Sequence, residues 1–325
     1  MKKTILSLLV VVGMIAGASA QIYSTDTFGA GANQFSLDFT TIGNPGNAAD
    51  STGYGKVDYT YRIGTHAISQ NQIAAATASG LQNVTAGAWS GNQPAANISW
   101  YQCAAFVNWL NTSTGHHVAY NLTYNNGSYS MGLWHSLDEG YNPSNPLRNN
   151  LALYVLPSTD EWYKAAYGMN NGMGYYLFPT ASDTQPTIVA SGTNAGTAVY
   201  NLYSSVQGPA SVYEAGGLSS YGTMGQGGNL YQYMEGAAYG LSNIDLSVAR
   251  DVRGGSWYSA EYLSPGNAVA MSSSYSFYNY SDNPVDYIGF RVAAVPEPST
   301  CALFALGAIT MLMVMRRKQR LGQAF

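Results

Sequence analysis

Charged side chains are scarce in this chain of 325 residues, since Asp, Glu, Lys and Arg make up only 9 % of it. Apolar types make up 46 %, and tyrosine alone contributes 27 residues. A disordered chain has the opposite composition, with much charge and few aromatic residues. The sequence therefore predicts a folded body with a sizeable core.

Basic residues are especially few in the body of the chain, 21–294, because six of the 13 Lys and Arg lie in the two ends. The body keeps seven bases against sixteen acids, a net charge of −9. Such a surface repels phosphate backbones, which argues against a nucleic-acid partner. A surface that is neutral, polar and aromatic suits contact with carbohydrate or protein, although this composition is also common in exported bacterial proteins.

Cysteine is nearly absent as well. Only Cys103 lies in the body, so no internal disulfide is possible there and the fold depends on its core. Cys103 begins an i, i+3, i+4, i+7 pattern with Phe106, Val107 and Leu110, which predicts a helix with this thiol inside the core.

The first twenty residues have the three parts of a secretory signal. Lys2 and Lys3 give a basic start, 5–16 is apolar, and the small residues before Gln21 fit a signal peptidase site. We expect 1–20 to be removed by signal peptidase between Ala20 and Gln21. An uncleaved membrane helix is the less favoured alternative.

The other end, 295–325, combines Pro296-Glu297-Pro298, an apolar run over 301–315 and a basic tail. Fifteen helical residues span about 22 Å, less than the roughly 30 Å of a bilayer core, so the run is a marginal transmembrane helix. The basic tail would hold that end in the cytoplasm. The arrangement resembles the PEP-CTERM sorting signal, which exosortase reads in bacteria with an outer membrane.

This resemblance implies cleavage near 296–298 and delivery to the cell surface, the outer membrane or the extracellular matrix. Before cleavage, the C-terminal helix would anchor the protein transiently in the inner membrane.

Two capping boxes indicate helix starts within the body. Ser99 to Gln102 opens the first, and Ser158 to Glu161 opens a shorter helix that Gly168 ends. Another helix is expected over 69–80.

The remaining segments of the body are richer in turns. Apolar and polar residues alternate over 28–61 around glycine and Asn-Pro-Gly, which predicts strands and turns. The segment 112–150 reads as an irregular insertion, and 175–240 as short strands with long ordered loops. No linker divides the body.

Three stretches resemble the formylglycine-generating (sulfatase-modifying factor) family in the same order. They are 94–110, with Ser99-Trp100 and a helix ending in Trp109-Leu110; 156–166, with Leu156-Pro157 and Glu161-Trp162; and 253–257 with 288–292, which read R-G-G-S-W and I-G-F-R-V. The matched positions, which we interpret as structural, are Trp100, Leu156, Pro157, Glu161, Trp162, Gly228, Asn229, Arg253, Gly254, Gly255, Ser256, Trp257, Gly289, Phe290 and Arg291.

The resemblance implies a C-type-lectin-like α+β fold over 21–294, with small antiparallel sheets, two main helices and much loop. For Arg253 and Arg291 we favour a structural role, in which a rare arginine ties loop carbonyls or an acid together.

The copper chemistry of the family is not expected here. Its enzymes oxidise a substrate cysteine with a copper ion held by two cysteines just after R-G-G-S-W, and the alignment puts Ser259 and Ser264 there. A hydroxyl is a poor ligand for soft cuprous ion, so no catalytic residue is assigned.

The family calcium loop is degenerate in the same way. Gly225 replaces its Asp and Gln232 replaces its Glu, which leaves only the carbonyls of Gly228 and Leu230 as ligands. Calcium affinity depends on the number of carboxylates, so we expect this site to be weak or empty. Calcium and copper thus stay possible by family analogy only, and no cofactor is expected.

A related branch, the ergothioneine-type sulfoxide synthases, binds iron through three histidines. The four histidines of this chain show no metal-ligand spacing.

We therefore favour an exported, exosortase-sorted protein with a non-catalytic binding or structural domain, whose ligand is polysaccharide or a surface protein. The alternative is a diverged oxidoreductase of the formylglycine-generating and nonheme-iron sulfoxide synthase superfamily.

Overall fold

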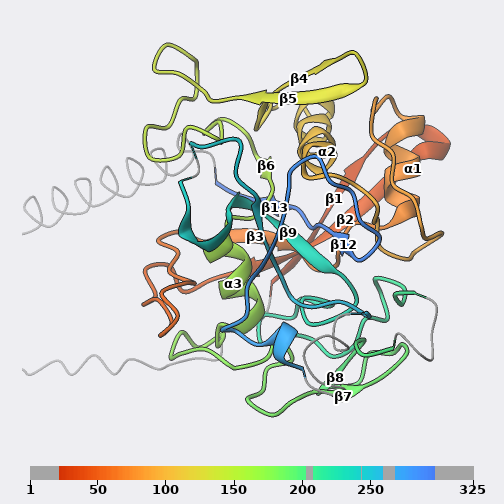
Figure 1. The fold of residues 1–325 in the computed structure, drawn as a ribbon, viewed down its shortest axis with the longest axis vertical. Helices are drawn as coiled ribbons and strands as arrows, with labels where there is room; N and C mark the ends of the chain where they lie inside the picture. Colours follow the sequence, from red (N-terminus) through yellow and green to blue (C-terminus); the bar gives the residue numbers. More distant parts are fainter. Residues whose placement is uncertain (1–21, 203–207, 243, 259–267, 297–325) are drawn as a thin grey trace, which may run out of the picture.

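The computed structural model describes residues 22–202, 208–242, 244–258 and 268–296. Within them the chain forms three α-helices and several small sheets joined by long loops (Figure 1). This confirms the α+β class that the sequence predicts. The two main helices are present, and the third is the short helix expected over 69–80.

A five-stranded antiparallel sheet forms the centre. Its strands, in spatial order, are β1 (Tyr23–Phe28), β2 (Phe35–Ile42), β3 (Tyr61–Gly64), β13 (Ala293–Ala294) and β6 (Tyr154–Val155). β13 comes from the far end of the domain and pairs with β3 on one side and β6 on the other. The two ends of the domain are therefore joined in one sheet.

The helices are α1 (Gln70–Ala78), α2 (Trp100–Ser113) and α3 (Thr159–Tyr167). All three begin with a complete capping box, in which a serine accepts from a backbone N–H while the side chain three residues later accepts in return. Losing such a cap costs about 0.5–2 kcal/mol. The pairs are Ser69 with Gln72, Ser99 with Gln102, and Ser158 with Glu161.

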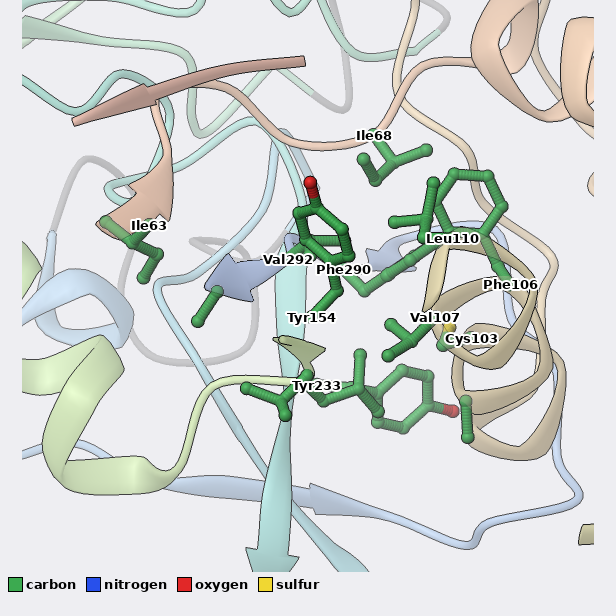
Figure 2. Close-up of a cluster of buried hydrophobic side chains, with 14 of the residues drawn as sticks. Ile63, Ile68, Cys103, Phe106, Val107, Leu110, Tyr154, Tyr233, Phe290 and Val292 are labelled. Carbon is green, nitrogen blue, oxygen red and sulfur yellow. The ribbon is translucent and has the colours of Figure 1, made fainter. Parts of the chain in front are cut away.

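The main core lies between α2 and the sheets. Figure 2 shows Cys103, Phe106, Val107 and Leu110 on the face of α2 that the core covers. The Phe106 ring meets the Phe290 ring edge to face, with centroids 5.5 Å apart. Cys103 is fully buried, which raises the pKa of its thiol well above the usual range and confirms the predicted core position.

A second sheet contains β11 (Phe277–Asn279), β10 (Arg250–Arg253), β9 (Tyr231–Ala237) and β12 (Ile288–Gly289), in that order. β12 runs parallel to β9, and the other pairs are antiparallel. A two-stranded sheet, β7 (Thr187–Ile188) with β8 (Thr197–Ala198), lies in the loop-rich region expected over 175–240. Short 3-10 helices span Gly31–Asn33, Ala238–Gly240 and Val269–Met271.

The insertion at 112–150 is more regular than predicted. It contains a hairpin of β4 (Asn121–Asn125) and β5 (Ser128–Gly132), drawn in yellow above α2 in Figure 1. Asn126 and Gly127 form its two-residue turn with φ values of +50° and +86°. Asn-Gly is the usual sequence of such a turn, so the hairpin had a signal that the loop-rich composition concealed.

No helix of the described residues is long and apolar enough to cross a membrane. The apolar run at 301–315, expected to be a short transmembrane helix, lies outside the described residues.

Candidate functional site

The family-motif residues gather around β9 and β10, where the chain concentrates its rare charges. Arg148 reaches two carboxylates: Nη1 lies 3.0 Å from Glu161 Oε1, and Nε lies 2.7 Å from Glu235 Oε1. Its Nη2 also donates to the Leu156 carbonyl at 3.0 Å. We call Arg148, Glu161 and Glu235 the buried charge network, since all three lie in the interior.

In the buried charge network, the positive charge of Arg148 compensates for the burial of Glu161. Burial alone would raise the pKa of Glu161, but the charge of Arg148 and the hydrogen bonds from Arg148 and Tyr59 outweigh it and hold that pKa below its usual value. Glu161 is therefore an ionised structural anchor that also caps α3. Tyr120 donates to Glu235 at 3.0 Å and adds a neutral partner to the pair of acids.

Arg253 of the R-G-G-S-W motif lies beside β10's own acid. Its Nε is 3.1 Å from Asp251 Oδ2, and its Nη1 donates to the Tyr275 carbonyl at 3.0 Å. The guanidinium lies over the Tyr54 ring, 4.5 Å from the centroid. These contacts connect β10 to two loops and leave the arginine almost fully buried.

Arg291 is a buried cation surrounded by oxygen atoms. Its Nη1 and Nη2 donate to the carbonyls of Gly64 and Met224, each at 2.7 Å, and its Nε donates to Gln232 Oε1 at 2.7 Å. Burial lowers the pKa of this guanidinium to about 9, which leaves it charged at neutral pH.

Both ends of the Gln232 amide are hydrogen-bonded within the protein. Its Oε1 accepts from both Arg291 and Trp162, the latter at 2.8 Å, while its Nε2 donates to the Gly225 carbonyl at 2.8 Å. A calcium ion needs free oxygen ligands and several carboxylates. The segment from Gly225 to Gln232 does not fit this ion, because its side-chain oxygen already serves the Arg291 cation.

The other motif residues also form the interior. Gly254 has φ +103°, and a Cβ there would lie 2.5 Å from the Gln226 carbonyl oxygen. Gly228 has φ +77° and would meet the Val199 carbonyl oxygen at 2.3 Å. Only glycine fits both places. Asn229 holds the backbone of Ala210 with both ends of its amide.

The remaining motif positions are buried too. Trp100 donates to the Met234 carbonyl at 2.8 Å, and the Pro157 carbonyl accepts from Glu235 at 2.8 Å. The buried set is completed by Leu156, Leu230, Gly255, Ser256, Trp257, Gly289 and Phe290. The motif therefore builds the interior of the domain, and its side chains bring no reactive group to the surface of the described residues.

Several expected site residues lie outside the described residues. They are Ser259 and Ser264, which stand for the copper cysteines, and the processing positions Ala20, Gln21, Glu297 and Pro298. Pro296 is the last residue described. Within the described segments, no three His, Cys, Asp or Glu side chains lie together in a group that could hold a metal ion.

Lys164, which the sequence analysis did not single out, is a buried amine. Its Nζ donates to the Asn44 carbonyl at 2.8 Å, and burial lowers its pKa to about 8. It borders a hollow of about 260 Å³ beside Asp50 and Tyr175. Asp50 already accepts from the Tyr163 hydroxyl, and Tyr175 donates to the Gly55 carbonyl. We therefore interpret the polar groups of this hollow as structural.

A larger hollow lies between the β4–β5 hairpin and the start of α2. It has a volume of about 820 Å³ and is lined by residues from segments 83–85, 99–102, 124–129, 246–248 and 280–284. We call it the tyrosine groove, because Tyr101, Tyr124, Tyr129 and Tyr280 line it. The sequence analysis noted the abundance of tyrosine but could not locate this groove.

Comparison with known proteins supports the fold and the motifs. The family described as the sulfatase-modifying factor enzyme 1-like domain matches residues 33–295, and the PEP-CTERM protein-sorting motif matches 294–318. Among proteins of curated function, no significant match is found.

Solved structures give the same picture. Treponema denticola variable protein 1 is 21 % identical over 84 % of this chain and 99 % of its own, with a TM-score of 0.53. CarF is 18 % identical over 80 % and 98 %, with a TM-score of 0.52, and PvdO from Pseudomonas aeruginosa is 13 % identical over 83 % and 98 %, with a TM-score of 0.50. These likenesses show the fold, which is C-type-lectin-like as expected.

Proposed function

Because the chain belongs to the sulfatase-modifying factor enzyme 1-like domain family and ends in a PEP-CTERM sorting motif, we propose that its domain is a non-catalytic binding module of the cell surface or extracellular matrix. The sorting motif makes it an exported protein that exosortase processes in the cell envelope. Transient anchoring in the inner membrane before cleavage belongs to the same proposal.

The donor set supports the loss of the family oxidation. Serine stands at both positions that hold the copper cysteines in the family, and a hydroxyl binds a soft metal ion weakly. At the calcium loop, Gly225 and Gln232 supply no carboxylate, and Gln232 Oε1 already accepts from Arg291 and Trp162, so this loop offers a hard cation no carboxylate ligand.

The single observation that carries the binding role is the tyrosine groove. The described residues form a hollow of about 820 Å³ at this place, lined by polar, aromatic and apolar side chains with one carboxylate, Asp282. Concave sites with aromatic walls and a few convergent polar groups are the usual form of binding sites in proteins. Most of the family-motif side chains lie in the interior and maintain the scaffold that presents the groove, while Ser99, Tyr101 and Gln102 of the 94–110 stretch line it.

The test has a chemical arm and a binding arm. The purified exported protein is loaded with copper, iron or calcium, dialysed, and analysed by elemental mass spectrometry. A cysteine peptide is then incubated with the copper-loaded sample and examined for conversion to formylglycine. We expect no stoichiometric metal and no conversion. Stoichiometric copper or iron with turnover of the peptide would replace the binding role with an enzymatic one.

In the binding arm, the protein is mixed with surface and matrix material from a bacterium that uses the same sorting signal. We expect it to be retained more strongly than an unrelated acidic protein of similar size. Equal retention of the two proteins would refute the binding role.

A further inference from the structure

The tyrosine groove is nearly free of charge. Among the described residues that line it, Asp282 is the one carboxylate, and none is lysine or arginine. Arg250 approaches from the interior, where its Nε donates to the Ser281 hydroxyl at 3.2 Å. The exposed side chains of Asn83 and Ser128 provide amide and hydroxyl groups at the wall, while the Gln102 amide is already hydrogen-bonded to Ser99 and Thr85. Such a lining pairs with neutral hydroxyl groups and offers no counter-charge for an anionic polymer.

Exposed tyrosines extend the groove along β11. Tyr280 on its rim lies 6.3 Å from Tyr278, which lies 5.5 Å from Tyr239, measured between ring centroids. We call Tyr239, Tyr278 and Tyr280 the tyrosine track. Their side chains are 58 %, 42 % and 56 % exposed. Each ring therefore lacks much of the stabilisation that a large aromatic side chain gains when it is buried.

The track includes a strained residue. Tyr239 has φ +55°, in the left-handed region that a bulky side chain rarely adopts. Holding a residue there costs about 1–3 kcal/mol, and the cost is tolerated mostly where the position matters for function. Here the strained backbone places an exposed ring beside Tyr278.

Contacts join the walls of the groove. The single hydroxyl proton of Tyr129 is shared between the carbonyls of Gln82 and Asn83, each 3.3 Å away, so the hairpin contacts the opposite loop. Tyr124 lies opposite Tyr129 in the hairpin, with ring centroids 4.8 Å apart. The Tyr101 amide donates to the Ser281 carbonyl at 3.3 Å. A site whose walls are already joined loses less conformational entropy when a ligand binds.

From these observations we propose that the tyrosine groove and the tyrosine track together bind a neutral polysaccharide chain. The apolar C–H face of a sugar ring stacks on tyrosine, while its hydroxyls bond to the amide and hydroxyl side chains of the wall. The three rings, which meet edge to face at 63° and 88°, together offer more apolar surface than one sugar unit covers, and this favours a chain over a single sugar. The net charge of −9 on the body disfavours acidic polymers. This inference rests on the binding role proposed above and names its ligand class.

The experiment compares variants of the purified exported protein on immobilised polysaccharides. Neutral glucans, mannans and galactans form one panel, and alginate and hyaluronate form an anionic panel. We expect at least one neutral polymer to bind, with the anionic panel weaker. Tyr280→Ala and Tyr278→Ala should each lower the affinity about fivefold or more, the scale of one lost aromatic contact. Tyr23→Ala is the matched control, since Tyr23 is 53 % exposed and lies outside the groove and the track.

The outcomes separate the ligand class from the binding role. If matrix material retains the protein but no neutral polysaccharide binds or competes, the ligand class is wrong and the binding role stands. The same conclusion follows if protease treatment of the matrix abolishes retention, or if Tyr278→Ala and Tyr280→Ala bind like Tyr23→Ala. If neither matrix nor polysaccharide retains the protein, both proposals are overturned.

Discussion

The buried charge network and the tyrosine groove differ in where they place the rare and the abundant residue types of the chain. The scarce basic residues lie mostly inside, whereas part of the abundant tyrosine lies on the surface. Five of the seven basic residues in the body are buried, namely Arg148, Lys164, Arg250, Arg253 and Arg291. Tyrosine fills much of the core too, yet the rings of the track stay exposed. Most of the rare basic residues are therefore structural, and part of the aromatic excess lies on the surface.

The difference explains why the family motif and the proposed function lie in different places. A buried arginine surrounded by carboxylates or carbonyls is costly to disturb, because its partners lose their compensation when it changes. A surface ring with no hydrogen-bond partner can change without affecting the fold. The motif residues thus maintain the scaffold, while the exposed rings of the tyrosine track can be substituted without disturbing the fold.

The largest effect should come from the buried charge network. Arg148→Met removes the cation that Glu161 and Glu235 share, which leaves two buried carboxylates without a counter-charge. We expect the free energy of unfolding in urea to fall by about 3–5 kcal/mol. Adding Glu161→Gln and Glu235→Gln to this variant should recover part of the loss. A fall of under about 1 kcal/mol for Arg148→Met would contradict the role assigned to the network.

A smaller effect is expected at His66, which packs against Tyr213 near Arg291. Burial, with the charge of Arg291 in second place, lowers the pKa of His66 to about 4, while Asp38 opposes the shift. Between about pH 6.5, the ordinary pKa of histidine, and about pH 4, His66 binds a proton in the unfolded chain but not in the folded chain. The stability contribution of His66 is therefore complete above pH 6.5 and is lost as the pH falls toward 4.

His66→Gln should remove this slope. Urea titrations from pH 7 to pH 4 are expected to show about 1–2 kcal/mol less acid sensitivity in the variant than in the unchanged protein. The depressed pKa of Glu161 acts at lower pH, since its stabilisation is present above the ordinary carboxylate pKa and is lost below it. Parallel curves for the two proteins above pH 4.5 would mean that His66 titrates normally.

The fold was predictable where the sequence has local signals. The capping boxes at Ser99 and Ser158 place two helices within a residue of their observed starts. The hairpin at 121–132 was missed because Asn and Gly also dominate the loops around it. The partners of the Gln232 side-chain oxygen, Arg291 and Trp162, lie 59 and 70 positions away in the sequence. No local pattern therefore reveals that this oxygen is already hydrogen-bonded.

The groove could not be predicted at all. Its walls come from five segments between residues 83 and 284, and they meet only because α2, the β4–β5 hairpin and the sheet of β10 and β11 bring them together. A count of 27 tyrosines indicates aromatic surface somewhere, but most of these rings also suit a core. Which rings remain exposed depends on packing that no single segment encodes.

The smallest effect on stability should come from the groove, and it tests the comparison from the other side. Tyr280 is 56 % exposed, and its ring meets the Tyr278 ring edge to face. Tyr280→Ala should therefore change the free energy of unfolding by no more than about 0.5 kcal/mol. Tyr233, fully buried in the core, is the contrast, since Tyr233→Ala should cost about 3–5 kcal/mol. If Tyr280→Ala destabilised the protein as much as Tyr233→Ala, the exposed rings would be part of the scaffold and the division between interior and groove would fail.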